Sequence, residues 1–219
     1  MSNHQKRLSA PKHYPVERKE TTYVSTIKGS RNADTAVPAV LFLRDVVGYA
    51  DSSKEATEIV TNGDLLRNGD RIGDIQEGLG ILDLIELPET GEAFRVLKNR
   101  DNLDFVRVEN DTVFAKVVDK SVEGDEFVYR LHNGENYRTG DSFSTGNTLV
   151  FGDGVEEVEF EEGAEALVVK GSHAGETAEV KELNDRGMNP NTALIENEEG
   201  VEYETQQENL VAVTGVNYR

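Results

Sequence analysis

Apolar residues recur at helical spacing in one short part of the chain. Residues 38–48 place apolar side chains at every third or fourth position, which predicts a short helix. An S-x-x-E capping box begins at Ser52 and predicts a second helix, which ends at Asn62 and Gly63. Helix is therefore expected mainly within residues 38–62.

Strand patterns dominate the rest of the chain. Residues 64–72 predict two short strands joined by Asn68 and Gly69, a pair that favours a tight hairpin turn. Short β-branched or aromatic runs separated by turn residues predict further strands, at 81–87, 103–108, 112–118, 126–131 and 148–151, and then at 164–169, 177–183, 193–196, 203–205 and 210–213. The last five suit a small barrel, in which closure removes exposed edges.

These patterns predict an α+β, mostly β protein in four parts. Residues 1–36 lack sustained periodicity and contain two prolines and a basic bias, which indicates an extended arm. A helix and hairpin module at 37–91, a central β domain at 92–160 and a small barrel at 161–219 are expected to follow.

Charge is distributed unevenly along the 219 residues, which carry 23 Lys and Arg against 42 Asp and Glu. Residues 1–31 have seven bases and two acids, whereas the remaining 188 residues have a net charge of −24. A basic arm on an acidic body predicts that the arm binds a polyanion. The plain alternative is an ordinary flexible terminus.

The acidic body has two explanations. Acids stand in doublets and Lys is scarce, as in proteins of extreme halophiles. At about 1 M salt the Debye length is roughly 3 Å, so repulsion among surface carboxylates is largely screened. The alternative is an acidic mesophilic protein that avoids nucleic acid.

Composition excludes several chemistries. Zero cysteines exclude disulfides, thiolate metal sites and a cysteine nucleophile. The four histidines have no metal-ligand spacing, and the acidic doublets lack an apolar setting that would raise one pKa. No apolar run of membrane-spanning length and no secretory signal is present. We therefore expect a soluble, intracellular protein without a metal site.

Residues 37–91 resemble the αL RNA-binding fold, the "S-four" domain of several ribosomal and RNA-modifying proteins. Two physical arguments agree with this resemblance. The free N–H groups at a helix N-terminus attract phosphate, and an Arg side chain can form two hydrogen bonds to a phosphate group. The resemblance implies RNA contacts from the helix ends and the hairpin, at Arg44, Tyr49, Ser52, Ser53, Lys54, Asn62, Arg67, Asn68 and Arg71.

Residues 166–180 resemble a KOW motif, a strand–glycine loop–strand unit of SH3-like barrels that meet RNA or protein. The resemblance implies contacts from the loop at Lys170, Gly171, Ser172 and His173. Ala178 stands where the family often has a third glycine.

Both motifs, with the arm segment 6–12 and the segments 43–50, 131–134 and 137–141, resemble the archaeal and eukaryotic S-four-e family. The resemblance covers nearly the whole chain. It implies a structural constituent of the small ribosomal subunit that binds small-subunit rRNA and neighbouring ribosomal proteins on the cytoplasmic ribosome. It also implies a protein that is not an enzyme and has no cofactor, membrane partner or small-molecule substrate. The arm residues expected to contact rRNA are Lys6, Arg7, Lys12, Tyr14, Arg18, Lys19, Lys28 and Arg31. For Tyr14 and Tyr23, packing against the body is an equal alternative to stacking on bases.

Departures from the family pattern shift the expected binding towards the arm. Thr57, Glu58, Asp64 and Asp70 stand where relatives often carry Lys or Arg, which weakens the αL surface electrostatically. Two other function classes were weighed. An RNA-modifying enzyme such as a pseudouridine synthase would need a G-R-L-D-type segment, which is missing from the sequence. A KOW-containing transcription or RNA-processing factor would lack the αL module and the arm.

Overall fold

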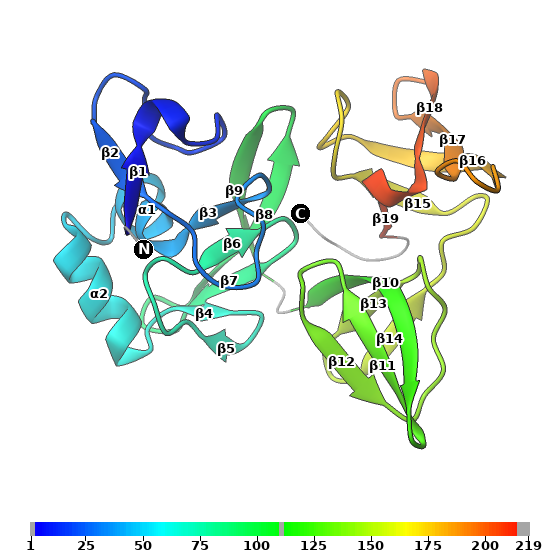
Figure 1. Cartoon of the computed structure of the whole chain (residues 1–219), viewed down its shortest axis with the longest axis horizontal. Coiled ribbons are helices and arrows are strands. Elements are labelled where there is room, and N and C mark those ends of the chain that lie inside the picture. Colours follow the sequence, from blue (N-terminus) through cyan, green and yellow to red (C-terminus); the bar gives the residue numbers. More distant parts are fainter. Residues whose placement is uncertain (1–2, 110–111, 214–219) are drawn as a thin grey trace. The chain divides into compact units, whose positions relative to one another are not determined.

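The computed structural model describes residues 3–109 and 112–213, which form two compact units (Figure 1). The first unit comprises residues 3–97 and 101–109, and the second comprises residues 98–100 and 112–213. Strands outnumber helices throughout, which confirms the mostly β fold class. None of the helices in these residues is both long and apolar enough to cross a membrane.

The N-terminal segment of the first unit is folded, not extended as the sequence pattern predicted. β1 (His4–Lys6) pairs antiparallel with β2 (Tyr23–Ser25), and a 3-10 turn (Arg7–Ser9) follows β1. Several of its side chains are buried although they follow no regular period, at Ala10, Tyr14, Val16 and Val24, whereas Leu8 is exposed. Irregular burial of this kind leaves no periodic signal in a sequence.

The two predicted helices are both present. The first begins as α1 (Ala39–Leu41) and continues as a π-helical turn (Phe42–Val46). The second is α2 (Ser53–Asn62), capped by Ser52, whose hydroxyl accepts the backbone N–H of Glu55 at 3.3 Å. The capping box in the sequence therefore marks the helix start correctly.

A five-stranded antiparallel sheet forms the rest of the first unit, in the order β5-β4-β7-β8-β9. Its strands are β4 (Leu66–Arg67), β5 (Asp70–Arg71), β7 (Leu84–Leu87), β8 (Glu92–Asn99) and β9 (Asn102–Val108). A separate pair joins β3 (Ala36–Pro38) to β6 (Gly78–Gly80). Because β8 pairs with β7, this sheet extends beyond residue 92, where the sequence pattern placed the start of the central β domain.

The predicted hairpin turn lies between β4 and β5. Asn68 and Gly69 have φ angles of 54° and 84°, so both residues are in the left-handed region. Gly adopts this region freely and Asn tolerates it, which explains why this dipeptide predicts the turn.

The second unit begins with another five-stranded antiparallel sheet, in the order β12-β11-β10-β13-β14. Its strands are β10 (Val113–Glu123), β11 (Glu126–Leu131), β12 (Asn136–Thr139), β13 (Thr148–Phe151) and β14 (Val155–Val158). The core on one face centres on Val117, Tyr129 and Leu149, none more than 1% exposed.

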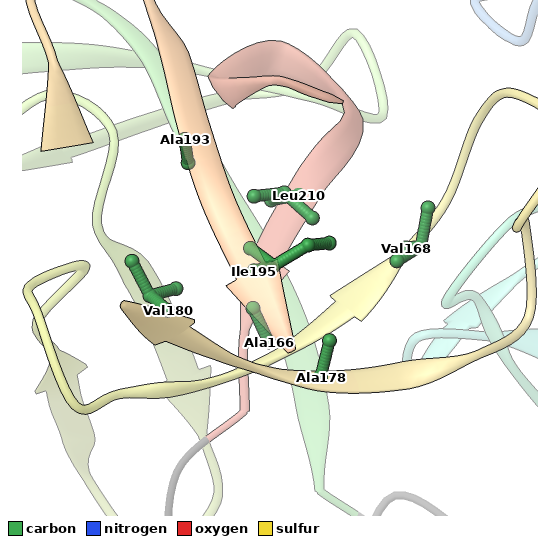
Figure 2. Packing of buried hydrophobic residues seen from close by; sticks show 7 residues of the cluster. All are labelled: Ala166, Val168, Ala178, Val180, Ala193, Ile195 and Leu210. Carbon is green, nitrogen blue, oxygen red and sulfur yellow. The ribbon is translucent and has the colours of Figure 1, made fainter. Parts of the chain in front are cut away.

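The last five predicted strands also form one antiparallel sheet, in the order β18-β17-β16-β15-β19. They are β15 (Glu165–Val168), β16 (Thr177–Asn184), β17 (Thr192–Asn197), β18 (Glu202–Gln206) and β19 (Leu210–Ala212). Small and branched side chains fill its interior, including Ala166, Val180 and Ile195 (Figure 2). Closure of this sheet into a barrel stays a prediction.

Candidate nucleic-acid interface

A loop at residues 12–19, here called the basic loop, presents cations on the first unit. Lys12, Arg18 and Lys19 are exposed around a shallow depression of about 670 Å³. Glu17 is the one acid that lines this depression among the described residues. The arrangement is suited to the phosphate backbone of a nucleic acid, which Lys and Arg recognise by charge and hydrogen bonds.

Arg7 supports this loop from inside and is not a free cation. Its guanidinium is 3% exposed and donates to the carbonyl oxygens of Val16 at 2.7 Å and of Pro11 and Tyr14 at 3.3 Å. Burial, and then the charge of Arg18, lower the pKa of Arg7. The predicted RNA contact at Arg7 is therefore corrected to a role in holding the loop.

Tyr14 and Arg31 are corrected in the same way. Tyr14 is 3% exposed, and burial raises its pKa to about 12. Arg31 is 7% exposed and forms an ion pair with Asp83. Sequence alone cannot show this pairing, because the two residues are 52 positions apart.

A groove of about 390 Å³ brings together Lys28, Arg44 and Ser53 from three separate parts of the sequence. Lys28 Nζ lies 3.0 Å from Asp74, and Arg44 pairs with Asp45 at 2.8 Å. Both ion pairs reach solvent, so each contributes little stability and can exchange its carboxylate for a phosphate. The groove is the second place where predicted residues converge.

The remaining αL positions divide between the two ends of α2. Ser52 uses its hydroxyl as the helix cap, whereas Ser53 and Lys54 are exposed beside it. Lys54 Nζ is 4.0 Å from Glu58, a pair exposed to solvent on both sides. Asn62 is also exposed but lies at the other end of a ten-residue helix, about 15 Å away.

The hairpin residues differ in their availability. Arg67 donates to the Gly78 carbonyl at 2.9 Å and pairs with Glu77 at 3.4 Å. The Asn68 amide donates to Asp83 at 2.8 Å, so its role is to hold the turn. Arg71 is exposed and is the hairpin residue best able to meet RNA.

Tyr49 lies in a surface cluster that the sequence did not predict. It is 41% exposed and donates its hydroxyl to Glu92, which raises the pKa of Tyr49. Arg107 pairs with the same carboxylate at 2.9 Å. Arg107 went unnoticed because it is a single base within a strand pattern.

The KOW loop lies in the second unit. Lys170, Gly171 and Ser172 are exposed, and Lys170 Nζ is 3.6 Å from Glu208. The His173 ring stacks on Tyr203 with centroids 4.0 Å apart. Residues 112–213 hold seven bases and 23 acids, so this loop projects from an acidic surface.

Among residues 3–109 and 112–213, no three His, Asp or Glu side chains are grouped so that they could hold a metal ion.

Known proteins with a similar sequence align with nearly the whole chain. No family model matches it. Small ribosomal subunit protein eS4 of Haloarcula marismortui is 36% identical, over 97% of this chain and 96% of the relative. The eS4 proteins of Halorubrum lacusprofundi and Methanopyrus kandleri are 37% and 31% identical, over 97% and 96% of this chain and 93% and 91% of the relatives.

The fold has a solved counterpart. The crystal structure of the 30S ribosomal protein S4e from Thermoplasma acidophilum matches with a TM-score of 0.69 at 22% identity. The match covers 85% of this chain and all of that chain, so the two share a fold. Together with the sequence identity and coverage of the relatives, this shows that the chain belongs to the small ribosomal subunit protein eS4 family.

Proposed function

We propose that this protein is a structural constituent of the small ribosomal subunit that binds small-subunit rRNA through the first unit. Membership of the eS4 family is the observation that carries the ribosomal role. The ribosome of the cytoplasm is the corresponding location. The role is structural, with no reaction assigned to the chain.

The residues proposed to face rRNA are the basic residues whose side chains solvent can reach. The basic loop contributes Lys12, Arg18 and Lys19, and Lys6 lies on nearby β1. The groove contributes Lys28 and Arg44. The outer residues of the αL module add Lys54 and Arg71, while Arg7, Tyr14 and Arg31 are left out because they are buried.

The acidic second unit is expected to add protein contacts. With 23 acids among residues 112–213, it repels a polyanion except where salt screens the charge. Neighbouring ribosomal proteins are therefore the partners that suit most of its surface. The KOW loop contact with RNA stays a prediction.

A transcription or RNA-processing role is less well supported. That alternative rests on the KOW resemblance alone, whereas the eS4 relatives match both units.

Sedimentation tests the proposal. A tagged chain, expressed in a haloarchaeal host, should migrate with small subunits when a lysate in molar KCl is separated on a gradient. The purified protein should bind naked small-subunit rRNA more tightly than large-subunit rRNA. Migration in the soluble fraction, away from subunits, would contradict the ribosomal role.

A further inference from the structure

The groove between the paired strands β1 and β2 and the start of α2 combines two kinds of surface. Its floor is apolar, since Val24, Val40 and Leu41 are each no more than 4% exposed. Its polar lining includes two cations, a hydroxyl and two aromatic rings, at Lys28, Arg44, Ser53, His4 and Tyr23. Its volume, about 390 Å³, lies within the range of roughly 300–1,000 Å³ that is usual for small-ligand sites.

Tyr23 is an exposed aromatic ring on a supported backbone. The side chain is 56% exposed and meets His4 edge to face, with centroids 4.9 Å apart. The ends of the paired strands β1 and β2 are held by Gln76, whose side-chain amide donates to the Asn3 carbonyl at 2.7 Å and the Thr26 carbonyl at 3.3 Å. A ring held in this way can stack on a planar ligand without being ordered first.

Two cations of the groove can donate hydrogen bonds to an anion, and each of them also contacts a carboxylate. Lys28 and Arg44 are the formal cations among its lining residues, and Asp74 is the formal anion. The backbone N–H of Gln76 and then Lys28 stabilise the Asp74 carboxylate, which lowers its pKa. Arg44 keeps further guanidinium donors beside its contact with Asp45, so it can add a phosphate oxygen.

We infer that this groove binds one unstacked nucleotide of a single-stranded RNA segment, with the base stacked on Tyr23 and the phosphate on Lys28 and Arg44. This rests on the proposed rRNA-binding function and narrows it to unpaired RNA. A duplex keeps its bases stacked inside, so an exposed ring can select only bases that are splayed out. An acidic peptide would use the cations but gain nothing from the ring.

A tryptophan probe tests the base contact directly. The chain contains no Trp, so Tyr23→Trp introduces a single tryptophan at the groove, whose emission can be excited selectively in the presence of the remaining tyrosines. A short oligouridylate should quench its emission, whereas an RNA duplex of the same length and an oligoglutamate should not. Met188→Trp, at a fully exposed position in the second unit, is the matched control and should stay unquenched with all three probes.

Affinity gives an independent readout. Tyr23→Ala should weaken binding of the oligouridylate roughly fivefold to a hundredfold, while Tyr23→Phe keeps the ring and should bind as the original chain does. Because Tyr23 is more than half exposed, both variants are expected to fold.

The outcomes separate the two proposals. Equal quenching by duplex and single strand, or full affinity in Tyr23→Ala, would overturn the nucleotide site even if rRNA binding is retained. Quenching by oligoglutamate would assign the groove to an acidic peptide instead. Failure of the original chain to bind any rRNA would overturn the proposed function itself.

Discussion

Arg31 and Asp83 form a buried bidentate ion pair that joins the N-terminal segment to the sheet of the first unit. Arg31 Nε lies 2.8 Å from Oδ2 of Asp83, and Nη2 lies 2.7 Å from Oδ1. The same carboxylate accepts the Asn68 amide at 2.8 Å and the Gly80 backbone N–H at 2.7 Å. One aspartate therefore connects the N-terminal segment, the hairpin turn and β6.

Arg31→Ala should destabilise the first unit strongly. Both side chains are at most 4% exposed, and removal of one partner leaves an uncompensated buried charge, at a cost of about 3–5 kcal/mol. Urea denaturation in molar KCl measures the loss. Lys28→Ala removes an exposed ion pair and should cost about 1 kcal/mol or less. Similar losses in the two variants would mean that burial of the Arg31 pair has no energetic consequence.

Local signals in the sequence predicted the elements that form locally. The Ser52 capping box and the Asn68-Gly69 turn each depend on neighbouring residues, and both lie where the pattern placed them. β8, β12 and β14 went unpredicted because polar or charged residues make up half or more of each strand, so no apolar run marks them. The N-terminal segment was misread because its burial depends on distant residues such as Gln76.

The sequence predicted the candidate site as a set of residue types, mostly basic with some aromatic and polar side chains. Charge alone could not separate exposed Lys12 and Arg18 from buried Arg7 and Arg31, since their availability depends on tertiary contacts. Tyr14 and Tyr23 were equivalent as aromatic residues in a basic segment. Their exposures, 3% and 56%, distinguish them only in the folded chain.

Charge reversal in the basic loop should weaken rRNA binding. The triple variant Lys12→Glu, Arg18→Glu, Lys19→Glu removes three phosphate contacts. The slope of log affinity against log salt should become shallower by about 0.7 to 0.9 per lost contact. Filter binding with small-subunit rRNA at several KCl concentrations measures both changes.

Reversal of acids in the second unit provides the control for that variant. Glu198→Lys and Glu199→Lys change exposed residues outside the proposed interface and should leave the salt slope unchanged. If the basic-loop variant bound rRNA with the original affinity and slope, the loop would have no part in the interface.

Lys116 should make the stability of the second unit depend on pH. Its Nζ donates to the carbonyl oxygens of Gln207 at 2.7 Å and Leu210 at 2.6 Å, which joins the two sheets of this unit. Burial lowers its pKa from 10.5 to about 8. Between these two values the unfolded chain binds more protons than the folded chain, so stability should rise as pH increases.

Urea denaturation at a series of pH values between about 8 and about 10.5 measures this rise. Lys116→Met should abolish it, and Lys170→Met, which changes an exposed lysine, should preserve it. A rise of equal size in Lys116→Met would assign the effect to another group.

The distribution of acids predicts that the second unit depends most on salt. Seven bases face 23 acids between residues 112 and 213, against 15 bases and 18 acids between residues 3 and 109. At about 0.01 M salt the Debye length is roughly 30 Å, so most acids of the second unit repel one another; at about 1 M it is roughly 3 Å. Dialysis to low KCl should therefore open β10–β19 before the sheet of the first unit, as followed by hydrogen exchange of backbone amides.

Neutralising exposed doublets, with Glu161→Gln, Glu162→Gln, Glu198→Gln and Glu199→Gln, should lower the KCl concentration needed to protect the second unit and leave the first unit unchanged. Simultaneous opening of both units, unaltered by the glutamine variant, would show that surface repulsion does not set the salt requirement.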